Sequence, residues 1–398
     1  MPPTPPSAPP APFAVNELRL TPRQWLVAAL LIATIVGGLP PLWERIERFD
    51  TGPDYRIPYS LSEDYWLYAR RVRQTTRPEQ ILLLGDSVVW GEYVAPDGTL
   101  SHFLNQQSGG GDHFVNAGVN GLFPLAEEGL FHDYATALRG RKLILQYNPL
   151  WQTSAKVDLS ETKEESFNHT GLVPQFFPRI PCYRADANAR IGVVLDRSIP
   201  FFAWAGHLRT AYFDHKGLPA WTLQEDSSSP PHRPNAWRNP FAQITLTVPP
   251  APSPDPARGP ASPRHQPWSA NRSATRFEWV GLDQSLQWRA FREVVTSLRA
   301  RGNDVFVIVG PFNEHMLLEE NRPAYRQIRD GVQAWLNEHN IHCLAPDTLP
   351  TELYADASHP LTAGYEVLAA RLRADPRFAA WAGVPSEPAP STVPPGRQ

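Results

Sequence analysis

Ser87, His359 and Asp356 are three residues whose types could together perform nucleophilic catalysis. A serine hydroxyl attacks a carbonyl carbon efficiently only when a nearby base removes its proton, and a histidine serves best when a third group fixes its tautomer. Asp356 precedes His359 by three residues, a spacing at which a turn can bring the carboxylate to the imidazole. The sequence therefore predicts a catalytic triad with Ser87 as the nucleophile.

Acyl transfer also needs hydrogen-bond donors for the charged oxygen of the tetrahedral intermediate. The backbone N–H groups of Ser87 and Gly121 and the side-chain amide of Asn148 fit that need. Glycine suits position 121 because a substrate must approach the bare backbone closely. Simpler explanations exist for each residue: Ser87 as a helix N-cap, His359 as a surface turn residue, Asn148 as a strand-end partner and Gly121 as a turn glycine.

All of these residues follow short apolar runs that are typical of buried strands. Such runs alternate with helical patterns, which predicts an α/β fold with a parallel sheet covered by helices. Ligands of open parallel sheets bind outside the carboxyl ends of the strands, so these residues would meet at one edge. The predicted strands are residues 81–84, 114–117, 143–147, 305–309 and 341–344.

Three later segments carry apolar residues at helical spacing, so each predicted helix offers one apolar stripe to the sheet. The loop after the fourth strand holds Asn313, Glu314 and His315, which we expect to be solvated and outside the triad. The three stripes are Phe291, Val294, Val295 and Leu298; Tyr325, Ile328, Val332, Trp335 and Leu336; and Tyr365, Leu368, Ala369 and Leu372.

Four sequence blocks occur in the order found in the SGNH, or GDSL-type, hydrolase superfamily. They are "GDSVVWG", the glycine of "NAGVNG", the asparagine of "LQYN" and "DASHP", and the resemblance covers residues 78–150 and 283–375. It implies a three-layer flavodoxin-like fold and ester hydrolysis or acyl transfer without a metal or other cofactor. Carried over by position, Ser87 resembles the nucleophile, Gly121 and Asn148 the oxyanion-hole contributors, and Asp356 with His359 the rest of the triad.

Two positions depart from the superfamily pattern. The family often has Asp where this chain has Leu122 and Pro149, which puts substrate contacts inferred from other members in doubt. The G-x-S-x-G pattern of α/β-hydrolases is absent because Val89 stands at the second glycine position. The nucleophile block also resembles that of membrane-tethered members associated with acylation or deacylation of cell-surface polymers.

Residues 25–43 contain no charged side chain for nineteen positions, a length close to the ~30 Å hydrocarbon thickness of a bilayer. This stretch predicts one membrane anchor, with a signal peptide or a buried core helix as the alternatives. The flanking positive charges, Arg19 and Arg23 before it and Arg45 and Arg48 after it, are balanced. We favour an orientation that places the short amino-terminal tail inside and the large body outside the cell membrane.

Composition limits the partners. The formal net charge is −3, from 37 Lys and Arg against 40 Asp and Glu, so nucleic acid is not an expected partner. Cys182 and Cys343 are too few for a disulfide framework and wrongly spaced for a zinc site, and a single bridge between them stays open.

Proline clusters suggest how the chain is divided into parts. So does residue 150, after which the alternation of strand and helix patterns is interrupted. The aromatic-rich and proline-rich stretch 151–280 is too long for a structureless loop and is expected to be an insertion with some order of its own. It could form a lid, a substrate groove or a membrane-facing surface, or pack on the parent domain. The predicted parts are a proline-rich tail (1–24), an anchor (25–43), a tether (44–77), the hydrolase-like domain (78–150 and 281–385), the insertion (151–280) and a disordered tail (386–398).

These observations predict a membrane-anchored serine esterase that cleaves O-acyl esters, acetyl esters above all, of a cell-surface glycan or lipid. An O-acyltransferase that modifies an extracellular polysaccharide shares the first half-reaction and differs only in the acceptor. A third reading is a non-catalytic binding subunit of a membrane acylation complex, which would require a partner protein. Retention of all five site residues argues against that third reading.

Overall fold

Five short apolar runs form the central sheet. The strands are β1 (Ile81–Leu84), β2 (Phe114–Asn116), β3 (Lys142–Tyr147), β4 (Asp304–Val309) and β5 (His342–Leu344). All of them pair in parallel in the order β2-β1-β3-β4-β5, which is the flavodoxin-like order. Most strand residues are buried, as expected when helices cover both faces of a sheet. The predicted strands are confirmed to within one residue at each end.

The computed structural model describes residues 20–52, 54–75, 77–223, 238–249, 266–270 and 273–385. It consists of two units, residues 1–46 and 47–398. The proline-rich start of the chain, most of the proline-rich run near residue 250 and the tail from 386 lie outside the described residues. The α-helices are α1 (Pro22–Ile46), α2 (Tyr65–Gln74), α3 (Ser87–Trp90), α4 (Leu100–Gln107), α5 (Pro124–Asp133), α6 (Ala187–Ser198), α7 (Pro200–Tyr212), α8 (Leu218–Thr222), α9 (Pro240–Gln243), α10 (Leu286–Ala300), α11 (Arg322–Glu338), α12 (Thr362–Ala374) and α13 (Pro376–Ala382).

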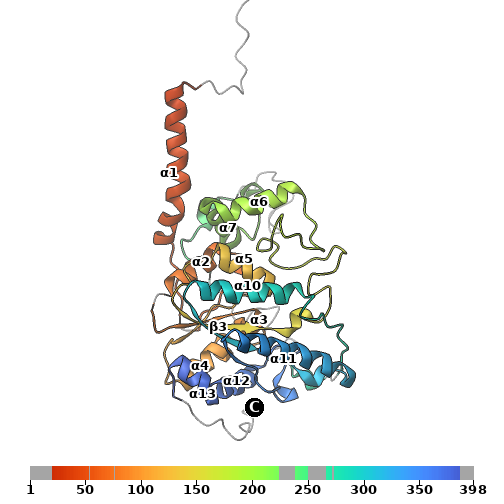
Figure 1. Cartoon of the computed structure of the whole chain (residues 1–398). Helices are drawn as coiled ribbons and strands as arrows, with labels where there is room; N and C mark the ends of the chain where they lie inside the picture. Colours follow the sequence, from red (N-terminus) through yellow and green to blue (C-terminus); the bar gives the residue numbers. More distant parts are fainter. Residues whose placement is uncertain are drawn as a thin grey trace, which may run out of the picture. The chain divides into compact units, whose positions relative to one another are not determined.

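Helices cover both faces of the sheet in the second unit. Figure 1 shows α2, α5 and α10 on one side of β3, and α4, α12 and α13 on the other. Each side has its own apolar core, because alternate strand residues point to opposite faces. The architecture is therefore three-layered α/β and compatible with a flavodoxin-like fold.

The predicted helical stripes supply much of these two cores. In α10 and α12 every residue of the predicted stripe is buried, and in α11 only Trp335 is half-buried. The stripe of α10 and most of that of α11 join the core on one face, and that of α12 joins the core on the other. Tyr325 of α11 lies in a smaller cluster. The period of 3.6 in the sequence thus identified the buried side of each helix correctly.

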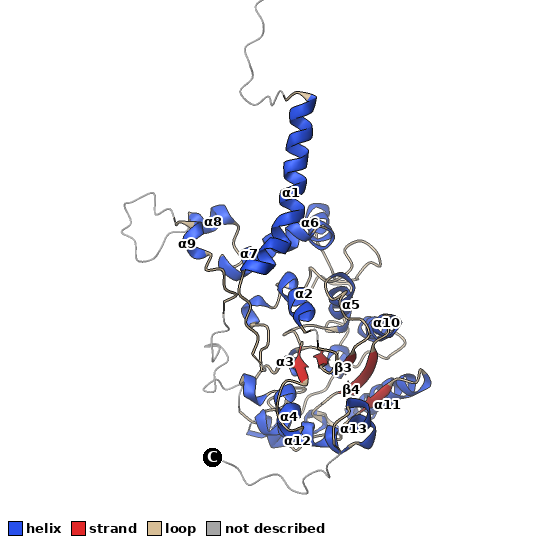
Figure 2. Cartoon of the chain, turned by 90° about the vertical axis from the view of Figure 1, so that its left-hand side faces the viewer, coloured by secondary structure: helices blue, strands red, loops and turns tan. Residues whose placement is uncertain are grey.

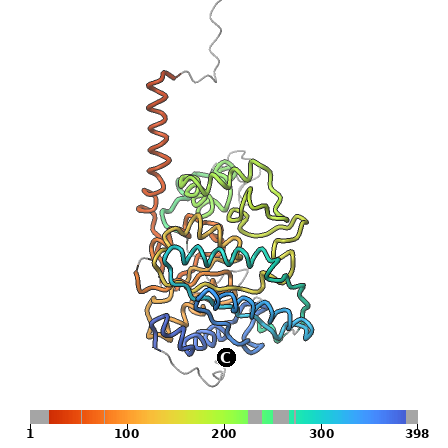
Figure 3. The backbone as a smooth tube through the Cα atoms, in the orientation of Figure 1, coloured from red at the N-terminus to blue at the C-terminus, as the bar shows by residue number. Residues whose placement is uncertain are grey.

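The two halves of the predicted hydrolase-like domain meet in the sheet. β3 belongs to the first half and β4 to the second, and six residue pairs join them, from Lys142 opposite Asp304 to Tyr147 opposite Val309. The tube in Figure 3 shows these segments side by side, although the long insertion separates them in sequence. The insertion has helices of its own, α6 to α9. Cys182 in the insertion and Cys343 in β5 are both free and buried, so no disulfide joins them.

Residues 44–77, expected to be a tether, are instead divided between the two units. The first three complete α1, and Glu47 onward belongs to the second unit. Helix α2 buries Leu67, Tyr68 and Val72 in the core beside the sheet. This stretch is polar and rich in arginine, and the amphipathic helix that it contains was not identified from the sequence.

Helix α1 is 25 residues long, and by length and composition it could cross a membrane. A signal sequence near the amino terminus would satisfy the same criteria. Pro40 and Pro41 lie within this helix, which continues to Ile46.

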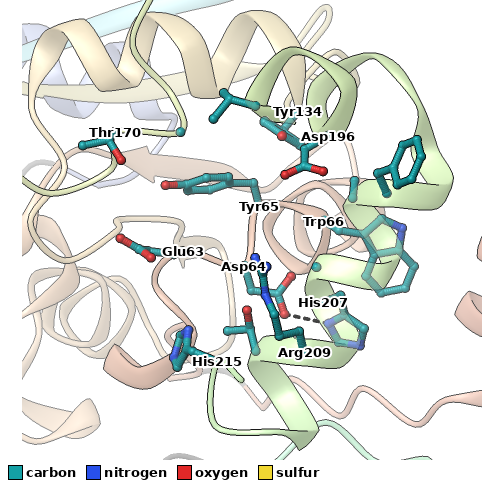
Figure 4. A pocket seen from close by; sticks show the side chains of 16 residues that line it. Glu63, Asp64, Tyr65, Trp66, Tyr134, Thr170, Asp196, His207, Arg209 and His215 are labelled. Carbon is teal, nitrogen blue, oxygen red and sulfur yellow. Dashed lines mark hydrogen bonds and ion pairs between the residues drawn. The ribbon is translucent and has the colours of Figure 1, made fainter. Parts of the chain in front are cut away.

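Glu47, the first residue of the second unit, lies in a buried network of charged side chains. Its carboxylate contacts Arg70 Nη1 at 2.5 Å and His207 Nε2 at 2.9 Å, and it accepts a hydrogen bond from the Tyr212 hydroxyl at 2.6 Å. The other ring nitrogen of His207 lies 2.6 Å from Asp64 Oδ2, as Figure 4 shows. All five residues are buried. The network therefore fastens α7 of the insertion to α2 and to the beginning of the unit.

The charges in this network balance only when His207 is protonated. Burial by itself would lower the pKa of His207, but Asp64 and Glu47 outweigh it and raise that pKa to about 9. At neutral pH two carboxylates then face the guanidinium of Arg70 and the imidazolium of His207. Removing one partner of such a buried set leaves an uncompensated charge.

We expect His207→Ala to lower the free energy of unfolding of the full chain by about 3–5 kcal/mol, because Glu47 and Asp64 would lose their shared cation. Denaturant titration of the detergent-solubilised protein measures this loss. The matched control is His132→Ala, whose imidazole pairs with Asp133 at the exposed surface and should cost about 1 kcal/mol or less. Equal effects of the two substitutions would contradict a structural role for the network.

Candidate active site

Ser87 is the first residue of α3, and Gly85 and Asp86 separate it from the carboxyl end of β1. Asp86 is the N-cap of this helix, and its Oδ1 accepts a hydrogen bond from the Val88 N–H at 2.8 Å. The Ser87 hydroxyl is therefore not the capping group, and the N-cap explanation of this serine is wrong. Its Oγ lies 2.7 Å from His359 Nε2.

His359 and Asp356 lie in the loop before α12, held together by a tight turn. Nδ1 of His359 lies 2.8 and 2.9 Å from the two carboxylate oxygens of Asp356. The backbone N–H groups of Ser358 and His359 also donate to Asp356 Oδ1, at 3.0 and 2.9 Å. The three-residue spacing thus lets one carboxylate hold both the turn and the imidazole. The structure brings together Ser87, His359 and Asp356 in the predicted order of contacts.

The carboxylates around His359 control its protonation. Burial alone would lower the pKa of His359, but Asp356, and beyond it Glu92 and Asp86, raise the pKa to about 9. Partial burial opposes ionisation of Asp356, yet the charge and hydrogen bond of His359 and the two backbone donors lower its pKa to about 2. These carboxylates therefore favour the protonated form of His359 in the resting site.

Glu92 is a site residue that the sequence did not reveal. Its Oε2 lies 3.4 Å from His359 Nε2, the same nitrogen that faces Ser87. The backbone N–H of Glu92 donates to the Ser87 carbonyl at 3.1 Å, which ties its position to the nucleophile. The edge of the Tyr93 ring packs against the imidazole with centroids 5.1 Å apart. Both residues directly follow the block "GDSVVWG", but their position in the sequence does not show that they contact His359.

Asn148 stands at the end of β3 beside the nucleophile turn. Its Nδ2 donates to Asp86 Oδ2 at 2.7 Å, and its Oδ1 accepts from the Leu150 N–H at 3.0 Å. Trp151 Nε1 donates to the same Asp86 oxygen at 2.8 Å. Burial raises the pKa of Asp86, and these hydrogen bonds oppose that rise. An amide nitrogen carries two hydrogens, and the bond to Asp86 uses one of them.

Gly121 lies in the loop between β2 and α5 with φ of +71°, a conformation that favours glycine. The Val119 N–H donates to the Gly85 carbonyl at 3.0 Å, so this loop passes next to the end of β1. A Cβ at position 121 would lie 2.6 Å from Asn168 Nδ2 of the insertion. Asn168 therefore approaches the bare backbone where a substrate was expected. No described contact joins Gly121 to Ser87, so its oxyanion role stays a prediction.

In the loop after β4, Asn313 contacts the segment that holds Asp356, whereas His315 is exposed as expected. Asn313 is buried, its Nδ2 donates to the Asp356 carbonyl at 3.2 Å, and its N–H donates to the Ala357 carbonyl at 2.8 Å. The expectation of a solvated loop is wrong for this residue. Glu314 pairs with Arg329 at 3.1 Å, away from the triad.

Within the described ranges, no group of three or more His, Cys, Asp or Glu side chains is placed to hold a metal ion. A cavity of about 350 Å³ lies between α2 and α7, lined by Trp66, Arg209 and His215 among others (Figure 4). Another, of about 630 Å³, lies beside α5, α6 and α10. Neither of these two cavities includes Ser87 or His359 in its lining.

No family model matches this chain, and no curated protein matches its sequence. The chemistry of the site is therefore inferred from its own residues.

Proposed function

We propose that this chain is a membrane-anchored serine esterase of the SGNH hydrolase type, cleaving O-acyl esters, acetyl esters above all, of a cell-surface glycan or lipid. One observation carries the proposal, the chain of contacts through His359. Its Nε2 lies 2.7 Å from Ser87 Oγ, and its Nδ1 lies 2.8 Å from Asp356 Oδ1. This path supplies a nucleophile, a base and the carboxylate that fixes the base. The order of the four sequence blocks and the parallel sheet support the family assignment.

In the proposed reaction, Ser87 Oγ attacks the ester carbonyl carbon while its proton passes to Nε2 of His359. Asp356 stabilises the imidazolium, and the N–H groups of Ser87 and Gly121 with the second amide hydrogen of Asn148 receive the oxyanion. Collapse of the intermediate breaks the bond to the alcohol, which takes the proton from Nε2, and leaves acyl-Ser87. Water then gives a proton to Nε2 and attacks the acyl carbon, and Ser87 departs with that proton.

Helix α1 supports a membrane location. We propose that it is retained as a single anchor and that the second unit lies on the extracytoplasmic side, where acylated surface polymers and lipids are found. The substrate would then be reached from the membrane surface.

Acyl transfer to a sugar hydroxyl is the second candidate, and the burial of Ser87 and His359 favours it. Ser87 and His359 are 6% and 5% exposed, so little of either faces bulk water. Restricting water protects an acyl-enzyme from hydrolysis and favours a bound acceptor. Both reactions share the acylation of Ser87.

We expect the full chain to be labelled by a fluorophosphonate probe and to hydrolyse an aryl acetate, and both activities to vanish in Ser87→Ala. The matched control is Ser198→Ala, at the exposed end of α6, which should retain both. Labelling is followed by mass spectrometry of the modified peptide. A wild-type chain that resists the probe would favour the non-catalytic binding subunit.

The labelling rate of Ser87 should rise with pH and level off above about pH 9, because only neutral His359 can accept the serine proton. The charged groups facing the imidazole are Asp356, Glu92 and Asp86. Replacing Glu92 by Gln removes one anion that stabilises the imidazolium, so the rising limb should move to lower pH by on the order of one unit. A limb that stays in place or moves upward in Glu92→Gln would contradict this account.

Hydrolysis and transfer are separated by product analysis in the presence of an oligosaccharide acceptor. An esterase should release free acetate at a rate that the acceptor leaves nearly unchanged, since water is the acyl acceptor. Acetylated sugar that forms faster than free acetate would instead establish transfer. The Ser87→Ala variant supplies the background for both products.

A further inference from the structure

Helices α6 and α7 form a hairpin in the insertion whose outer apolar side chains are exposed. Ile191, Val194 and Leu195 recur at helical spacing on α6, with exposed fractions of 49%, 38% and 40%, and Phe202 at the start of α7 is 40% exposed. None of the residues of α6 is buried. We call these four side chains the hairpin surface. Exposed apolar patches of more than a few hundred Å² on a folded protein mark protein or membrane interaction sites.

The hairpin is fastened to the residue at which the second unit begins. Two side chains of α7, His207 and Tyr212, contact the buried carboxylate of Glu47 at 2.9 and 2.6 Å. The next residue, Arg48, donates its N–H to the Leu246 carbonyl at 2.9 Å, so two successive residues of the chain are held here. Glu47 follows directly after Ile46, the last residue of α1. No flexible spacer therefore separates α1 from the part of the chain that α7 holds.

The position of the charge-free stretch in α1 limits where Glu47 can lie when this helix crosses a bilayer. The stretch ends at Trp43, and tryptophan is typical of the membrane–water interface. At 1.5 Å per helical residue, Glu47 begins only about 6 Å farther on, within the headgroup layer. This limit follows from chain connection alone and holds for any tilt of α1.

We propose that the hairpin surface docks on the lipid bilayer that α1 crosses, with Ile191, Leu195 and Phe202 among the headgroups and upper acyl chains. Lipid is the occupant because His207 and Tyr212 hold part of α7 at Glu47, the residue at which α1 leaves the bilayer. An amphipathic helix with an apolar stripe is the usual form of such an interfacial element. Figures 1 and 2 both place α6 and α7 at the end of the second unit opposite α12 and α13.

The docked hairpin would hold the Ser87 site at a fixed height and orientation above the bilayer. The accessible substrates would then be esters carried near the membrane surface, whether on a lipid or on a membrane-proximal glycan. This inference rests on the anchoring role proposed for α1 and does not depend on the esterase activity.

The test uses the full chain reconstituted into phosphatidylcholine vesicles, with an environment-sensitive fluorophore on Ile191→Cys. The matched control carries the same fluorophore on Ala380→Cys, an exposed position of α13 at the opposite end of the unit. The native cysteines are buried and should not react. Spin-labelled lipid should quench the fluorophore at position 191 several-fold more strongly than the one at position 380. Equal quenching at the two positions would overturn the proposal. This is also the result expected if a protein, and not lipid, covers the hairpin surface.

Two parallel measurements separate the possible failures. Flotation of the full chain with the vesicles tests whether α1 is a membrane anchor. A chain that does not float would also overturn the docking proposal. Removal of the first residues in cells as a signal peptide would overturn it as well. Fluorophosphonate labelling of Ser87 in the same sample tests the esterase. Quenching at position 191 without labelling would support docking and reject only the proposed activity.

Discussion

The hydrogen bond between Ser87 Oγ and His359 Nε2 joins two residues that lie 272 positions apart, and the proposed chemistry depends on it. The parallel sheet makes this contact available, because parallel strands present their carboxyl ends along one edge. Ser87 follows β1, and the loop with His359 follows β5 at the other side of the β3–β4 pair. Capping of α3 by Asp86 leaves the serine hydroxyl to the histidine.

Negative charge dominates the surroundings of the imidazole. Asp356 faces one ring nitrogen, and Glu92 approaches the nitrogen that also faces the serine. Such an arrangement strengthens the base, but it also favours the protonated form that cannot accept a proton from serine. A neutral ester that displaces water from the site would meet this charge distribution directly. Glu92 is thus placed where it can influence the protonation of His359.

The insertion contacts the rest of the second unit at two functionally distinct places. At one, His207 and Tyr212 hold the beginning of the unit. At the other, His169 joins the Tyr65 hydroxyl, 3.1 Å from Nδ1, to the Asn120 carbonyl, 2.9 Å from Nε2, in the loop that leads to Gly121. The insertion is therefore a structural element that supports both the beginning of the second unit and a loop next to the site. Some aromatic side chains of the insertion are buried in its packing, and others are exposed.

Local patterns in the sequence determined the elements. Buried strands appear as aliphatic runs and amphipathic helices as stripes of period 3.6, so the sheet, the helical faces and the Asp356–His359 turn could all be predicted from neighbouring residues. Tertiary structure alone decided which groups meet across long separations. Glu92 at the histidine, Asn168 over Gly121 and Asn313 behind Asp356 depend on how loops from different strands and the insertion pack together. The packing of residues 47–75 against the sheet could likewise not be predicted from the sequence. An arginine in a sequence does not show whether it faces water or, like Arg70, a buried carboxylate.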